Sequence, residues 1–147
     1  MTKTTDTTPR PLRPAFDAGT VVGGVVLAAL ASVAVNSVIA TIASSALPPG
    51  GTRMGLELQE YASLTVVGIL LGALAWFLVR RHADNPRAVL RYLVPAAVLL
   101  SLVPDFGILM TGVPLLNALA LVAMHLAVAA ITVPTLAKVL PLPLAEA

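Results

Sequence analysis

Four long stretches of this chain contain no Asp, Glu, Lys or Arg: residues 18–52, 61–79, 92–104 and 106–137. A helix rises about 1.5 Å per residue, so about 20 apolar residues cross the hydrocarbon core of a bilayer. Three of the stretches are close to that length or longer. The third, 92–104, is shorter, and its span begins at Pro86, with Arg87 and Arg91 on its first turns reaching the headgroups. The pattern predicts an all-α integral membrane protein, an antiparallel four-helix bundle.

Composition supports lipid as the solvent for most of the surface. Only 11% of the 147 residues are charged, whereas a soluble domain has about 25%. The basic residues do not gather with aromatic residues on one face, so nucleic acid is not an expected partner. The chain has no cysteine, which excludes disulfides, zinc–thiolate sites and thiol catalysis.

Helix-breaking residues set the expected limits of the spans. The run Pro48-Pro49-Gly50-Gly51 ends the first helix, and Asn85 with Pro86 provides an N-cap and a first helical position. We expect spans at about 20–44, 60–79, 86–103 and 114–137. They form a transmembrane domain over 18–138, between a flexible cytoplasmic tail (1–17) and a second cytoplasmic tail (139–147).

Two internal prolines and one connection are expected to depart from regular helix. Pro95 should kink the third helix, and Pro134 should disturb the last turn of the fourth. The apolar segment 104–114 is expected to be an interfacial loop, with a re-entrant loop as the alternative.

The N-terminal region has a second interpretation. A polar, basic start and an apolar run ending at Ala43-Ser44-Ser45-Ala46 resemble a signal peptide with a cleavage site. The apolar region exceeds the roughly 7–15 residues typical of a signal peptide. We therefore expect an uncleaved first helix, with cleavage as the alternative.

Basic residues predict the orientation. Eight of the nine fall in segments that four spans would place on one side, and only Arg53 falls on the other. Because Lys and Arg in short loops favour the cytoplasm, both termini are expected there. Aromatic residues near the span ends are expected to form interfacial belts; they are Phe16, Tyr61, Trp76, Phe77, Tyr92 and Phe106.

Small residues recur at helical spacing and predict close helix packing. The first helix has a stripe at spacing four, and the second has a GxxxG pair. The main positions are Gly24, Ala28, Ser32, Gly68 and Gly72. The functional interpretation is dimerisation, and the structural one, which we favour, is packing inside the bundle.

His125 is the ionisable residue deep inside a span, which makes it a functional candidate by default. The structural alternative, which we favour, is a neutral imidazole bonded to another helix. Asn36 lies at a similar depth, so we expect a polar pair between His125 and Asn36, with Ser32 and Ser101 as reserve partners.

The cytoplasmic arginines Arg80, Arg81, Arg87 and Arg91 are expected at the membrane interface, where they orient the chain and can attract anionic lipid headgroups. His82 beside them has no companion at metal-ligand spacing.

We expect the protein to bind neither a metal nor a cofactor and to have no enzymatic activity. No carboxylate lies at a span centre, and the two histidines differ in depth, so a bundle haem is not indicated. Asp105 and His125 can be imagined as acid and base, but no catalytic constellation is assembled.

The Asn36 helix, the segment Ser101-Leu102-Val103-Pro104 and the segment Met124-His125-Leu126 resemble an uncharacterised family of small four-helix membrane proteins from high-GC Gram-positive bacteria, the domain-of-unknown-function 6069 type. The resemblance covers nearly the whole chain after the N-terminal tail. It implies a multi-pass protein of the bacterial plasma membrane and no activity.

Two functions follow as hypotheses. The first is a non-enzymatic structural or accessory membrane component, with the lipid bilayer and a homo-oligomer or membrane protein as partners. The second is a small transporter or channel-like protein that uses His125 and Asn36.

Overall fold

The computed structural model describes residues 17–143, and this part of the chain is helical without strands. The helices are α1 (Ala18–Ala46), α2 (Leu58–His82), α3 (Pro86–Ser101), α4 (Val103–Leu109) and α5 (Leu115–Val139). Within residues 17–143, four segments are long and apolar enough to cross a membrane, and α3 with α4 counts as one of them, Pro86–Leu109. Most of the two expected tails lies outside the described residues.

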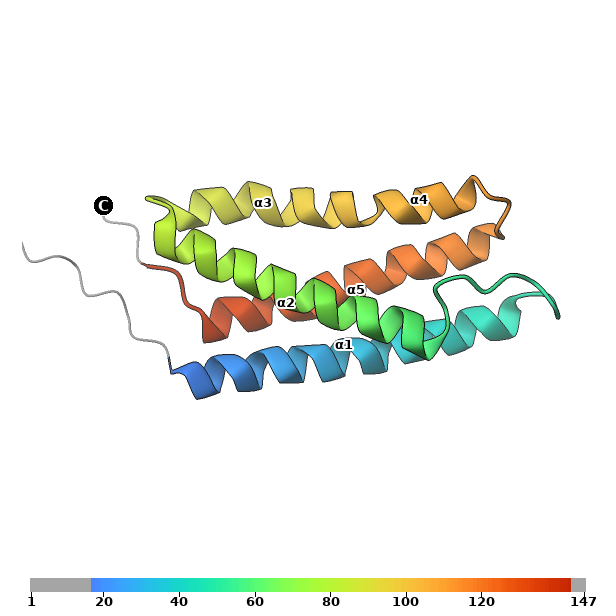
Figure 1. The fold of residues 1–147 in the computed structure, drawn as a ribbon, viewed down its shortest axis with the longest axis horizontal. Helices are drawn as coiled ribbons and strands as arrows, with labels where there is room; N and C mark the ends of the chain where they lie inside the picture. Colours follow the sequence, from blue (N-terminus) through green and yellow to red (C-terminus); the bar gives the residue numbers. More distant parts are fainter. Residues whose placement is uncertain (1–16, 144–147) are drawn as a thin grey trace, which may run out of the picture.

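The spacing-four stripe of α1 packs inside the protein. Ala28, Ser32 and Asn36 are almost completely buried. At Gly24 a Cβ atom would lie 2.6 Å from Cγ1 of Val139 on α5. The two helices run antiparallel beside each other (Figure 1), and the missing side chain at Gly24 permits their close approach.

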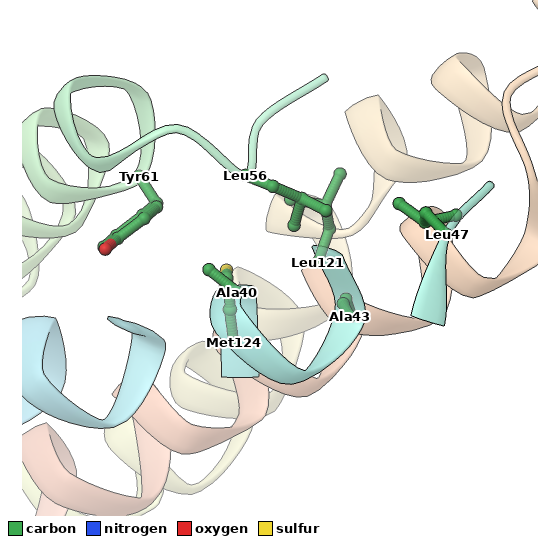
Figure 2. Close-up of a cluster of buried hydrophobic side chains, with 8 residues drawn as sticks. Ala40, Ala43, Leu47, Leu56, Tyr61, Leu121 and Met124 are labelled. Atoms are coloured by element: carbon green, nitrogen blue, oxygen red, sulfur yellow. The ribbon is translucent and has the colours of Figure 1, made fainter. Parts of the chain in front are cut away.

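Two apolar clusters hold the opposite ends of the helices. Figure 2 shows the first, where residues of α1, α2, α5 and the α1–α2 connection meet. Its buried members are Ala40, Ala43, Leu47, Leu56, Tyr61, Ala120, Leu121 and Met124. The second cluster joins α2, α3 and the end of α5 through Trp76, Leu90, Leu136 and Leu140.

The α1–α2 connection contributes Leu47 and Leu56 to the first cluster and packs closely against α5 at Gly55. Gly55 has a φ of +78°, a conformation that L side chains rarely adopt, and a Cβ atom there would lie 2.8 Å from Leu121. Its backbone N–H donates to the Glu60 carboxylate at 2.8 Å. Glycine therefore meets both a backbone and a packing requirement at this position.

The GxxxG pair of α2 faces outward. Gly68 and Gly72 are exposed, and a Cβ atom at either position would meet no atom of the described chain within 4 Å. Packing inside the bundle, the favoured interpretation of this pair, is therefore absent from the described structure. This surface of α2 is left to lipid or to another helix.

The expectation of an interfacial loop over 104–114 is wrong for its first half. The chain turns at Leu102 and then forms α4 up to Leu109. Pro104 has no backbone N–H, but at the second position of a new helix none is needed. The third span is thus interrupted at Leu102, while Pro95 lies inside α3.

Pro134 also lies inside its helix, because α5 continues to Val139. The hydroxyl of the following residue, Thr135, donates to the Ile131 backbone oxygen at 2.7 Å. The helix therefore extends past the expected end at residue 137.

Side chains cap two helix starts. Asn85 accepts from the Ala88 backbone N–H at 3.1 Å, with Pro86 in the first turn as expected. Asp17 accepts from the backbone N–H of Thr20 at 2.7 Å. That bond favours the charged carboxylate and lowers the pKa of Asp17. Its contribution to folding is therefore present above the pKa of an unfolded Asp and is lost as the pH falls through the lower folded value.

The predicted belt residues differ in burial, and Phe77 is partly buried against the second cluster. Tyr61 and Trp76 are buried among the helices, whereas Tyr92 and Phe106 are largely exposed. The expected interfacial belt is therefore compatible with the exposed pair and not with the buried one. Phe16 lies outside the described residues.

Replacing Gly24 with leucine should destabilise the protein by about 1–3 kcal/mol, because the side chain would overlap Val139. The matched control is Gly23→Leu, since a Cβ at Gly23 meets nothing within 4 Å. Unfolding in detergent micelles, followed by circular dichroism, measures the difference. Equal stability of the two variants would contradict the close α1–α5 contact.

Candidate functional site

Many hydroxyl groups of the helices bond the backbone of their own helix, while a second set of polar side chains contacts another helix or a connection. Within residues 17–143, contacts of this second kind join segments far apart in the sequence: Asn36 to Thr65, Tyr61 to Ser37, Trp76 to Leu140, Arg80 to Pro141, Asn117 to Met54 and His125 to Asp105. In an apolar surrounding such contacts satisfy groups that would otherwise remain without a partner.

His125 and Asp105 form the acid–base pair of the described structure. Nδ1 of His125 lies 3.0 Å from Oδ2 of Asp105, with the imidazole side chain 36% exposed and the carboxylate 6% exposed. The pair joins α5 to the first turn of α4. The structure buries Asp105 between these helices, where the residue as a whole is 4% exposed.

The same nitrogen of His125 lies close to two oxygen atoms. Nδ1 of His125 also lies 2.9 Å from the backbone oxygen of Leu121. The single hydrogen of a ring nitrogen cannot point along both directions, and Oδ2 of Asp105 has no partner with hydrogen-bond geometry among the described residues. When Nδ1 of His125 carries the hydrogen, it donates to the Leu121 backbone oxygen, and Asp105 Oδ2 is a close electrostatic neighbour.

The predicted hydrogen bond between Asn36 and His125 is not present in the structure. Asn36 Nδ2 donates to Thr65 Oγ1 on α2 at 3.0 Å, while His125 contacts Asp105 and Leu121. Two side chains on neighbouring helices can bond only if they lie at similar depth and also point toward each other from their helices. Asn36 faces the buried interior and His125 a half-buried surface.

The basic residues at the expected membrane interface differ in burial. Arg80 is buried, and its Nε donates to the Pro141 backbone oxygen at 2.8 Å. One turn earlier, Trp76 donates to the Leu140 backbone oxygen at 3.1 Å. Together they cap the carboxyl end of α5, where backbone oxygens lack helical donors. Arg81, Arg87 and Arg91 are exposed, which is compatible with the interfacial role expected of them.

Asn117 is a structural residue that sequence reasoning missed. Its side chain is completely buried, and Nδ2 donates to the Met54 backbone oxygen at 2.9 Å. This bond ties the α1–α2 connection to the start of α5. The sequence signal was an amide inside a predicted span, since buried amides in membranes need partners, but this signal does not identify the partner.

Chemically, the arrangement offers one pair of groups able to exchange a proton. Among residues 17–143, no group of three or more His, Asp or Glu side chains could hold a metal ion. His82 lies apart from this pair, with Nδ1 3.0 Å from the Leu78 backbone oxygen.

Comparison with known proteins places the chain in a family. Residues 16–141 match the family of unknown function DUF6069. The chain belongs to this family. No curated protein and no solved structure matches it, so the family match supplies membership and no activity.

A double-mutant cycle separates the observed pair from the predicted one. Asp105→Asn and His125→Gln should show a coupling energy of about 0.5–3 kcal/mol, because contacting residues are non-additive. Asn36→Leu and His125→Gln should be additive within about 0.5 kcal/mol, because no contact joins them. Unfolding in detergent provides both values. Coupling in the second cycle and additivity in the first would support the sequence-based pair instead.

Proposed function

We propose that this protein is a non-enzymatic, multi-pass component of the bacterial plasma membrane that acts as an accessory subunit through contacts inside the bilayer. The observation that carries the proposal is the use of the polar side chains. Residues that would be the candidates for chemistry, such as Asn36, Asn117 and Arg80, bond other helices or connections of the same chain.

The proposed arrangement in the membrane is a four-helix bundle with both termini in the cytoplasm. Four apolar segments supply the spans. The basic residues at the end of α2, at the start of α3, at the end of α5 and in the N-terminal tail support the orientation. Large exposed side chains such as Leu27, Leu30 and Leu71 suit a lipid environment.

The exposed face of α2 indicates where a partner helix would bind. Gly68 and Gly72 lie one turn apart with open space above them, and small residues at this spacing let two helices approach closely. The fold does not use this face itself. We therefore direct the functional test at these two glycines.

A second function, proton-linked transport, is favoured by the His125–Asp105 contact. An intramembrane histidine beside a buried carboxylate is a common element of proton pathways. Proton uptake into proteoliposomes that is lost in His125→Gln would support transport over the accessory role.

Affinity capture from native membranes, with proteins and lipids both identified, tests the accessory role. The wild-type chain and a Gly23→Leu control should bring down one membrane partner in a constant ratio. A Gly68→Leu/Gly72→Leu variant should retain about tenfold less, because leucine would block the approach of the partner helix. Gly23 is the matched control because it is also exposed, on α1.

Capture of nothing specific, or of the same partner in equal amount by all three proteins, would contradict this proposal. Circular dichroism of each variant confirms that loss of the partner is not loss of the fold.

A further inference from the structure

Three oxygen atoms between α1, α2 and α5 are buried without a hydrogen-bond partner among residues 17–143. They are Oγ of Ser32, Oδ1 of Asn36 and Oγ1 of Thr132. Ser32 is 0% exposed, Asn36 1% and Thr132 7%. An unpaired polar group in an apolar interior costs about 1–3 kcal/mol, so three of them together demand an explanation.

The hydroxyl groups are unusual for this chain. Ser37, Thr41 and Thr135 all donate to the backbone oxygen four residues earlier, at 2.7–2.8 Å. That bond is the usual way for a hydroxyl in an apolar helix to satisfy itself. Ser32 and Thr132 lie on the same two helices and make no such bond.

The antiparallel register brings Ser32 and Thr132 to similar heights, with Asn36 one turn beyond Ser32. Gly24 packs against Val139. Ser32 lies eight residues from Gly24 and Thr132 seven residues from Val139, so their heights above that contact are about 12 and 10.5 Å. Asn36 lies one turn further along the face of α1 that holds Ser32.

The side chain of Asn36 limits which ligand could satisfy the three oxygens. Its Nδ2 already donates to Thr65 at 3.0 Å, whereas its Oδ1 can only accept. The two hydroxyls can donate or accept. A ligand that donates to Oδ1 and accepts from a hydroxyl matches this set.

We propose that a single water molecule is bound here, bridging Oδ1 of Asn36 to the hydroxyls of Ser32 and Thr132. Three polar partners are the usual number for a buried water. A cation is disfavoured, because the three oxygens are neutral and the buried carboxylate of Asp105 contacts His125 instead of this site. A charge without a counter-charge is costly at this depth.

The test uses the full-length protein in lipid nanodiscs, labelled with ¹⁵N-asparagine. The chain has three asparagines, at positions 36, 85 and 117. Rotating-frame cross-relaxation between water and the Asn36 side-chain amide distinguishes proximity from proton exchange by its sign. We expect a proximity signal from a long-lived water, with the exposed Asn85 as the positive control for detection.

Variants assign the water to this site. Ser32→Ala combined with Thr132→Val should remove the Asn36 signal, and the control Thr135→Val should retain it, because its hydroxyl bonds within α5. Absence of a water signal at Asn36 in the wild-type protein, while Asn85 shows one, would overturn the proposal. That measurement needs no variant, so the proposal stays testable if the double variant fails to fold. A signal that survives in a folded double variant would also overturn it.

Discussion

Polar side chains between apolar helices have to find their partners within the protein, and much of this structure follows from that requirement. Asn36 reaches Thr65, Trp76 and Arg80 reach the end of α5, and Asn117 reaches the α1–α2 connection. Each bond specifies which helix lies beside which. Leucine contacts could not do this alone, because lipid tails offer leucine an equally apolar surrounding.

Small residues provide the second part of the specificity. Gly24 and Ala28 allow α1 to approach α5 closely enough for Ser32 and Asn36 to be buried completely. The glycines of α2 follow the same spacing but face outward. The same spacing of small residues thus serves the interior of the protein on one helix and lies on an open surface of another.

The sequence was sufficient to predict the helical class, the four apolar segments and the capping role of Asn85, because these depend on local composition. It could not predict the rotation of each helix about its axis. That rotation turned His125 toward Asp105 and left Gly68 and Gly72 outside. It was also unable to predict α4, because Pro104 is compatible both with a loop and with the first turn of a helix. Asn117 was missed since no local pattern distinguishes a tethering amide from a tolerated one.

The account depends most directly on four membrane crossings with both termini in the cytoplasm. Because the chain has no cysteine, single cysteines report topology without background. Thr52→Cys, Asp84→Cys and Thr111→Cys place one thiol in each of the three connections between the candidate spans. A membrane-impermeant maleimide applied to intact cells should label the variants at Thr52 and Thr111, and the variant at Asp84 only after lysis. Labelling of Asp84→Cys in intact cells, or protection of either of the other two in cells but not after lysis, would contradict the account.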